Sequence, residues 1–187
     1  MQLDKNKALT YTQIIDCTGK SKEQLYIILN YWYSNSFGSG KAVIQLNDKD
    51  AGVIIAKGYV DGIAQHVGGL IAQHVGGLNT FTVSITPIIK TDIKDGKVRV
   101  TYTIPSYEIE KKQGGGWLAA LSGNSRNAVE VKETWAIEKC FPFAKQDSHK
   151  NTSAKALVMA NAYSNVIMNK IEEAVKNGVS GNETDEW

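Results

Sequence analysis

The sequence predicts an α+β fold in which a single antiparallel sheet carries helices packed on one face. Three patterns lead to this prediction: a capped amphipathic helix after the first strand, alternating strands through the middle of the chain, and a long amphipathic helix near its end. The expected order is strand, helix, four strands, a variable region and a helix. One sheet with its helices on one face is the simplest arrangement of that order. We expect a single domain over residues 1–187.

The first strand and the first helix come from the N-terminal third of the chain. "ALTYTQIIDC" is rich in Thr, Tyr and Ile, which favour strands. Ser21 follows as a helix cap, and Gln24 stands three residues later, as in a capping box. The apolar residues after them recur at helical spacing and form one face: Leu25, Ile28, Leu29 and Trp32.

The middle of the chain reads as strands. "KAVIQL" and "GVIIAKGYV" are joined by "NDKDAG", a turn-forming segment. From Asn79 to Ile93 apolar residues alternate with polar ones, and Pro87 within this run predicts an edge position or a bend. Asp95-Gly96 fits a two-residue type I′ turn. That turn pairs Ile93 with Val98, Asp92 with Arg99, and Ile89 with Tyr102.

After Glu110 the pattern weakens. Residues 111–127 are Gly-rich and read as a loop, in which Trp117 either anchors a partner or fills a core edge. "VEVKETWAIEKC" alternates as a strand does, and a helix is expected from about Thr152 to Lys176. Gly178 is a plausible helix C-cap, and residues 178–187 are expected to be a frayed tail.

An eight-residue repeat is the most unusual feature. "IAQHVGGL" occurs twice in succession, from Ile63 to Leu78, and places His66 and His74 at equivalent positions. Neither helical nor strand periodicity decides its structure, because its glycines weaken both. Its place between two strands suggests a partly helical excursion over residues 61–79. A metal site at the two histidines would lack a third ligand beyond Asp61, so slippage and a binding role both remain open.

Residues that would carry catalysis are sparse. Gly19-Lys20-Ser21 lies where a P-loop ends, but Ile14 stands where that motif needs its first glycine, so no nucleotide site is expected. Neither a nucleophile with a base nor a pair of carboxylates stands out. We therefore expect no cofactor and no metal. A hydrolase is an alternative that a pocket joining His66 or His74 to a Ser or Asp would support.

Charge, cysteine content and hydropathy bear on nucleic-acid binding, disulfide formation and membrane insertion. The net charge of +2 gives no global basic field. Basic residues gather around the hairpin in residues 90–112: Lys90, Lys94, Lys97, Arg99, Lys111 and Lys112. They make nucleic-acid binding an alternative function. Alternating lysines are, however, typical of the solvent-exposed face of a strand. Cys17 and Cys140 fit one disulfide or two buried thiols equally well. No apolar run reaches the length of a membrane helix.

Several segments together resemble a known family. The helix "SKEQLYIILNYWYSNSF", the hairpin "KAVIQLNDKDAGVIIAKGYV" and the arm "IKDGKVRVTYTIPSYEI" resemble uncharacterised bacterial domains with a TATA-binding-protein-like fold, over about residues 8 to 110. The resemblance implies an extracytoplasmic protein, often secreted or lipid-anchored, from Gram-negative gut bacteria. It implies no established activity or catalytic residue. The repeat and the "GGGW" segment depart from the pattern.

These observations predict a non-catalytic domain at the cell envelope. It would bind a protein, peptide or glycan through its sheet face and its two Gly-rich segments, where long loops on a rigid scaffold often carry function. Five residues are the expected contacts: His66, His74, Lys97, Arg99 and Trp117. The N-terminus lacks the apolar core of a secretion signal, which fits either a cytoplasmic protein or a mature form whose signal was removed. The sequence leaves the oligomeric state open.

Overall fold

The computed structural model describes residues 2–36, 42–68, 79–113, 129–140 and 147–178. The expected α+β class is confirmed, but the expected single sheet is wrong, because the strands form one six-stranded and one four-stranded sheet. The chain divides into two compact units. The first unit comprises Met1–Tyr59, Thr86–Ile104 and Asn161–Trp187, and the second comprises Val60–Ile85 and Pro105–Ala160.

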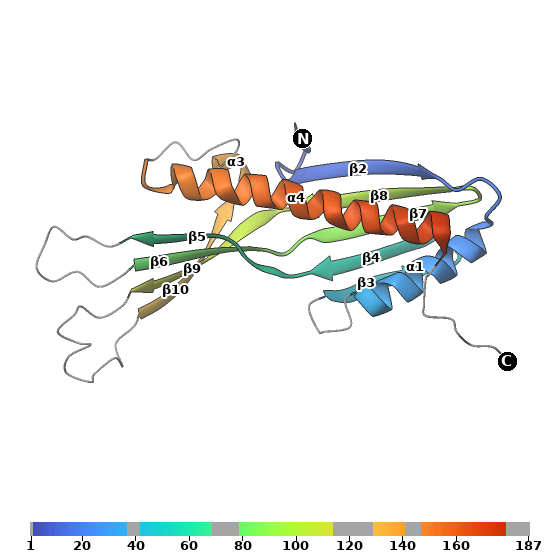
Figure 1. Cartoon of the computed structure of the whole chain (residues 1–187), viewed down its shortest axis with the longest axis horizontal. Coiled ribbons are helices and arrows are strands. Elements are labelled where there is room, and N and C mark those ends of the chain that lie inside the picture. Colours follow the sequence, from blue (N-terminus) through green and yellow to red (C-terminus); the bar gives the residue numbers. More distant parts are fainter. Residues whose placement is uncertain (1, 37–41, 69–78, 114–128, 141–146, 179–187) are drawn as a thin grey trace, which may run out of the picture. The chain divides into compact units, whose positions relative to one another are not determined.

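The first unit contains the six-stranded sheet, with strand order β1-β2-β8-β7-β4-β3 (Figure 1). All of its pairs are antiparallel. Its strands are β1 (Gln2–Leu3), β2 (Leu9–Asp16), β3 (Ala42–Asp48), β4 (Val53–Gly58), β7 (Ile88–Lys94) and β8 (Lys97–Ile104).

The β7–β8 hairpin has the predicted register, with Ile93 opposite Val98 and Asp92 opposite Arg99. Its turn is not the predicted type I′, which needs positive φ at both central residues. Gly96 has φ 68°, whereas Asp95 keeps a negative φ. Asp95 instead accepts a hydrogen bond from the backbone N–H of Lys22, so contacts with the segment after β2 shape this turn.

Both long helices contribute to the first unit. Helix α1 (Lys22–Ser36) begins with the predicted capping box, in which Ser21 Oγ accepts from the Gln24 N–H and Gln24 Oε1 accepts from the Ser21 N–H. Leu25, Leu29 and Trp32 are buried as expected, together with Tyr33. Helix α4 (Asp147–Asn177) begins five residues before the predicted start, and Gly178 follows it with φ 79°, as a C-cap requires.

The second unit contains the four-stranded sheet, with strand order β10-β9-β6-β5. Its elements are β5 (Val60–Gly68), β6 (Asn79–Ile85), β9 (Ser106–Gln113), β10 (Val129–Ala136) and the short helix α3 (Ile137–Cys140). All of its strand pairs are antiparallel. The strand expected for "VEVKETWAIEKC" is thus β10, and its last residues form α3.

Two prolines lie where the chain passes from one sheet to the other. The predicted long strand from Asn79 to Ile93 stops at Ile85 and resumes at Ile88, which confirms the bend expected at Pro87. Pro105 separates β8 from β9 in the same way. Proline has no N–H to donate to a sheet ladder, so pairing ends there and the next strand can join a different sheet.

The expected excursion over residues 61–79 is wrong where the structure describes it. Asp61–Gly68 lies in β5, and the first copy of the repeat is therefore extended, not partly helical. Ile63 and Ala64 are buried, so this copy contributes to the core. Residues 69–78, which include the whole second copy, lie outside the described residues.

Two other predictions concern the Gly-rich segment and the two cysteines. The Gly-rich segment expected at 111–127 starts with strand residues, because β9 continues to Gln113, and the rest of it lies outside the described residues. Cys17 and Cys140 are both free and buried, which confirms the thiol alternative over the disulfide.

Candidate functional site

Helices α1 and α4 contact the same face of the six-stranded sheet. Tyr33 of α1 lies beside Thr91 on β7. On β2, Tyr11 lies beside Ser164 of α4, and Gln13 Nε2 donates to Glu172 Oε2 at 2.5 Å. Because Thr91, Tyr11 and Gln13 align through the register across β8, all these contacts fall on one side of the sheet.

No described helix of the first unit contacts the opposite side, which we call the open face. Directly opposite residues on antiparallel strands share a face, so the register identifies its members. They are Thr10, Thr12, Ile14 and Asp16 on β2; Lys97, Arg99, Thr101 and Thr103 on β8; Ile88, Lys90, Asp92 and Lys94 on β7; Val53, Ile55 and Lys57 on β4; and Leu46 and Asp48 on β3.

An apolar cluster occupies one part of the open face. Leu46 on β3 stands directly opposite Ile55 on β4. Val53 is the preceding residue of β4 on the same face, and Ile88 on β7 stands opposite the following one, Lys57. Leu46 is 46% exposed and Ile88 is 36% exposed, while Val53 and Ile55 are half-buried. These side chains come from three neighbouring strands, and their positions are fixed by the sheet. The cluster can therefore offer a preformed apolar contact to another molecule.

Basic side chains lie on the same face as this cluster, and two of them, Lys57 and Lys90, are its direct neighbours in the register. The open face carries five of them, Lys57, Lys90, Lys94, Lys97 and Arg99, against three carboxylates, Asp16, Asp48 and Asp92. An excess of cations beside apolar side chains favours a ligand that carries both apolar groups and carboxylates.

Asp92 is the electrostatic centre of the open face. Its carboxylate pairs with Lys90 Nζ at 2.8 Å and with Arg99 Nη2 at 2.9 Å, so one anion is shared by two cations. Burial acts to raise the pKa of Asp92, but the hydrogen bonds and charges of Lys90 and Arg99 outweigh it and the pKa is lowered. Asp92 therefore stays ionised and holds both bases on the open face.

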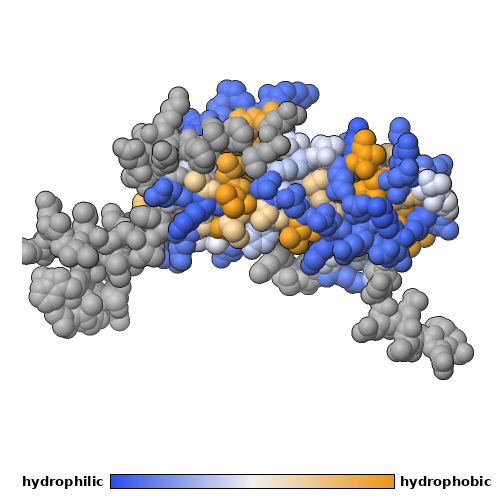
Figure 2. All heavy atoms as spheres, turned by 45° about the horizontal axis from the view of Figure 1, so that its top comes forward, coloured by the Kyte–Doolittle hydropathy of each residue, from blue (hydrophilic) through white to orange (hydrophobic). Residues whose placement is uncertain are grey.

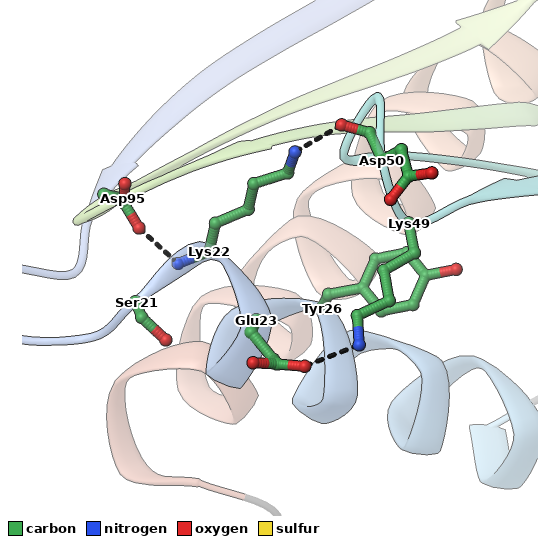
Figure 3. Close-up of a pocket in the computed structure, with 7 residues that line it drawn as sticks. All are labelled: Ser21, Lys22, Glu23, Tyr26, Lys49, Asp50 and Asp95. Carbon is green, nitrogen blue, oxygen red and sulfur yellow. Dashed lines mark hydrogen bonds and ion pairs between the residues drawn. The ribbon is translucent and has the colours of Figure 1, made fainter.

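A second candidate is a depression of about 440 Å³ at the start of α1 (Figure 3). The N-terminal turn of α1, the β3–β4 turn and the β7–β8 turn line it. Its lining residues are Ser21, Lys22, Glu23, Tyr26, Lys49, Asp50 and Asp95.

The polar groups in this depression bind one another. Lys22 Nζ donates to the Asp50 carbonyl oxygen at 2.5 Å, and Lys49 Nζ pairs with Glu23 Oε1 at 2.5 Å, as Figure 3 shows. The Lys49 hydrogen bond lowers the pKa of Glu23. Asp95 accepts from the Lys22 N–H at 2.7 Å and caps the helix from another loop. The depression thus joins the helix to two turns, and a ligand there would have to displace these contacts.

The five residues predicted from sequence lie in different parts of the chain. Arg99 and Lys97 lie on the open face, in the first unit. His66 lies on β5 of the second unit, opposite Phe81. His74 and Trp117 lie outside the described residues.

The basic hairpin is also divided between the two units. Lys90 to Arg99 belong to β7 and β8, whereas Lys111 and Lys112 belong to β9. Lys111 pairs with Glu133, and Lys112 pairs with Glu110 at 2.6 Å. Carboxylates thus partly neutralise the cations that would contact a nucleic acid.

The apolar cluster of the open face was not predicted from the sequence. Leu46, Ile55 and Ile88 lie on strands that carry apolar residues on both faces, so no clean alternation marked them. The run "GVIIAKG" was the available signal, because consecutive apolar residues in one strand put at least one of them on each side.

Exposed apolar residues alone do not single out a site. In the view of Figure 2 they form small patches separated by hydrophilic residues.

Within the described part of the chain, no group of three or more His, Cys, Asp or Glu residues is placed to hold a metal ion. The helices described there are also too short or too polar to cross a membrane.

Comparison with known proteins places the chain in a family. The model of a domain of unknown function with TBP-like fold, DUF4468, matches residues 11–108. A TBP-like protein from Parabacteroides distasonis has a similar structure, with a TM-score of 0.58, 10% identity, and coverage of 93% of this chain and 96% of that one. A DUF4468 family protein from Bacteroides ovatus gives a TM-score of 0.55 and 14% identity, and covers 90% of this chain and 86% of that one.

At such low identities the two structures support the fold alone. No curated protein matches the chain. The resemblance noted in the sequence is confirmed, since the family match spans the first helix, both predicted hairpins and the arm after them. Because this match covers more than half of the 187 residues, the chain belongs to the DUF4468 family of domains with a TBP-like fold.

Proposed function

We propose that this domain is a non-catalytic binding module whose open face receives a segment of a partner protein. The observation that carries the proposal is the open face itself: a partly exposed apolar cluster of Leu46, Val53, Ile55 and Ile88 on a face that also carries basic side chains. A partner segment with apolar residues flanked by Asp or Glu would match it.

The sheet supports binding because its side chains are held in place before a partner arrives. Helices α1 and α4 pack against the other face, so the strands are braced from behind. A preformed surface loses less conformational entropy on binding than a mobile one. The apolar cluster would supply most of the affinity, and the exposed Lys57, Lys94 and Lys97 would steer an acidic partner toward it.

We also propose that the domain acts outside the cytoplasm, at the cell envelope. This part of the proposal is supported by the sequence resemblance alone. Fractionation of cells that express the full-length gene, followed by mass spectrometry of the mature N-terminus, tests it. A processed or lipid-modified N-terminus in the envelope fraction supports the proposal, and an unprocessed protein in the cytoplasmic fraction contradicts it.

Selection from a random peptide library on the immobilised protein tests the binding chemistry. We expect enriched peptides to combine Leu, Ile, Val or aromatic residues with Asp or Glu. Enrichment of basic peptides, or no enrichment over an unrelated protein, would overturn the proposal.

A parallel measurement with heparin and duplex DNA at low salt tests the nucleic-acid alternative. The open face carries five bases, but Asp92 engages two of them. We therefore expect weak retention that disappears at modest salt. Tight DNA binding that survives physiological salt would favour nucleic acid as the partner.

A further inference from the structure

Strand β10 is a long, regular sheet edge in the second unit. All eight of its residues pair with β9 in unbroken register, from Val129 opposite Gln113 to Ala136 opposite Ser106. No described strand pairs with its other side. A strand edge of this length presents a row of backbone N–H and C=O groups to which another strand can bind.

The other three edges of the described sheets are interrupted. Strand β1 has only two residues. The register of β3 shifts between Ile44 and Leu46, and that of β5 shifts between Val60 and Ala64, where Gly62 takes φ 62°. Short strands and bulges are common ways to prevent pairing at an edge. Among the described edges, β10 alone has neither.

Charges alternate across β9 and β10 in a pattern that can extend past the edge. Lys112 stands opposite Glu130, and Glu110 stands opposite Lys132. Along β10 itself, Glu130 and Lys132 lie on the same face and pair at 3.4 Å, with both side chains well exposed. A neighbouring strand that placed a base beside Glu130 and an acid beside Lys132 would continue the alternation.

We propose that residues 129–133 of β10 pair antiparallel with the same residues of a second copy of this chain, about a two-fold axis at Val131. This register places Glu130 opposite the partner's Lys132, and Lys132 opposite the partner's Glu130. Each row then alternates in sign across four strands. Val131, which is 45% exposed, meets the partner's Val131 on the other face of the sheet. Such an interface is isologous, as in most homodimers, and joins two four-stranded sheets into one of eight strands.

A cysteine cross-link tests the register. Opposite Cα atoms in an antiparallel pair lie about 4.5–5.5 Å apart, within the range of about 4.4–6.8 Å that a disulfide spans. Under mild oxidation, the Val131→Cys variant should therefore form a covalent dimer at least about ten times faster than the Thr134→Cys variant. The reason is that Thr134 lies off the two-fold axis and does not meet Thr134 of the second copy. The wild type measures the background from the buried Cys17 and Cys140. Equal cross-linking of the two variants would overturn the register.

Charge reversal tests the interface without cysteines. Sedimentation equilibrium should show a concentration-dependent dimer for the wild type. Glu130→Lys and Lys132→Glu should each weaken it about tenfold or more, because each puts like charges opposite one another twice. Mixing the two variants should restore a dimer, since the heterodimer has only opposite charges at these positions. A folding defect in either variant would not be rescued in this way, so restoration separates the two explanations.

Matched reversals elsewhere provide the control. Glu173→Lys and Lys170→Glu change the same charges at exposed positions of α4 and should leave the dimer unchanged. A wild type that stays monomeric up to millimolar concentration would overturn the proposal, and so would a mixture that stays as weak as its two components.

Discussion

Asp92 shows how one residue sets the charge of the open face. Its pKa is lowered because the two bases that it pairs with outweigh the effect of burial. A carboxyl with a lowered folded-state pKa stabilises the fold above its unfolded value of about 3.9, and this contribution is lost as pH falls through the folded-state pKa. The ion pairs with Lys90 and Arg99 therefore weaken in acid.

The first prediction concerns the variant Asp92→Asn. It should be less stable than the wild type at neutral pH, and the difference in free energy of unfolding should shrink as pH falls below about 3.9 and through the folded-state pKa of Asp92, because the carboxyl then becomes uncharged, as the amide of Asn is. Urea unfolding at several pH values measures this difference. Glu173→Gln, at an exposed position, should show little pH-dependent difference. An Asp92→Asn difference that is constant over this pH range would contradict the account.

Gly52 is held in a conformation and a space that other residues do not fit. It has φ 67°, and a Cβ there would lie 2.6 Å from the Ile93 carbonyl oxygen. The Ile93 N–H donates to the Gly52 carbonyl oxygen at 2.7 Å, which keeps the two backbones close. Gly19 also has a positive φ, but nothing lies within 4 Å of its Cβ position.

The second prediction follows from this pair of glycines. Gly19→Ala should cost about 1–2 kcal/mol for the left-handed conformation alone. Gly52→Ala should cost more, on the order of 3 kcal/mol or above, because steric overlap with the β7 backbone is added. Chemical denaturation of both variants gives the comparison. Equal losses would show that the backbone near Gly52 moves aside without cost.

The third prediction concerns the cap that Asp95 provides from outside the helix. Asp95→Ala removes the acceptor for the Lys22 N–H and should lower the free energy of unfolding by about 1 kcal/mol. Asp50→Ala, in the same depression, should stay within about 0.5 kcal/mol, since Lys22 Nζ binds the Asp50 backbone oxygen. A larger loss of unfolding free energy for Asp50→Ala than for Asp95→Ala would show that side-chain charge, and not helix capping, holds the start of α1 to the two turns.

At the scale of elements, the sequence predicted the features that depend on neighbouring residues alone. The capping box marked the start of α1, and alternation over β7 and β8 predicted their register. Pro87 left two readings open, an edge strand or a bend. The choice depends on which strands pair beyond the proline, and that is a long-range property. The division into two sheets follows from it and could not be read from the alternating pattern.

The repeat shows the same limit. The first copy becomes a strand because β5 pairs with β6, although its own periodicity favoured neither structure. Gly68 pairs with Asn79, so ten residues lie between the paired ends. Removing Ile71–Leu78 would leave Gly69 and Leu70 as a two-residue connection. Glycine at the first position of such a connection suits a type II′ turn.

The fourth prediction is that this deletion is tolerated. The melting temperature should stay the same or rise, because closing a shorter loop costs less entropy, by about 0.6 kcal/mol for each halving of its length. Circular dichroism melting curves test it. In contrast, Ile63→Ala in the full chain should cost about 2–4 kcal/mol, since Ile63 is buried in β5. A deletion variant that melts about 5 °C lower or more would place the second copy in the core.

At the scale of the molecule, sequence reasoning predicted the family and named two residues of the surface that we propose for binding. Arg99 and Lys97 were expected contacts and lie on the open face, because strand alternation shows which residues face outward. His66 lies in the second unit, and its equivalence with His74 in the repeat carried no information about tertiary neighbours. The apolar cluster could not be predicted, because it depends on which strands neighbour β4 and on which sheet face the helices cover.

Two double variants in the first unit test whether the open face is the binding surface. Leu46→Glu with Ile88→Glu places two carboxylates in the apolar cluster, at positions that are already exposed. Ile27→Glu with Tyr31→Glu makes the same kind of change on the exposed side of α1, at residues that are 60% and 46% exposed. The two variants thus differ in which side of the sheet they alter.

The most direct measurement is the dissociation constant of a peptide selected on the wild type, determined by isothermal titration calorimetry for all three proteins. We expect the Leu46→Glu and Ile88→Glu protein to bind at least about tenfold more weakly, and the Ile27→Glu and Tyr31→Glu protein to bind as the wild type does. Unchanged affinity in the first variant, or a loss confined to the second, would contradict the assignment of the open face as the binding surface.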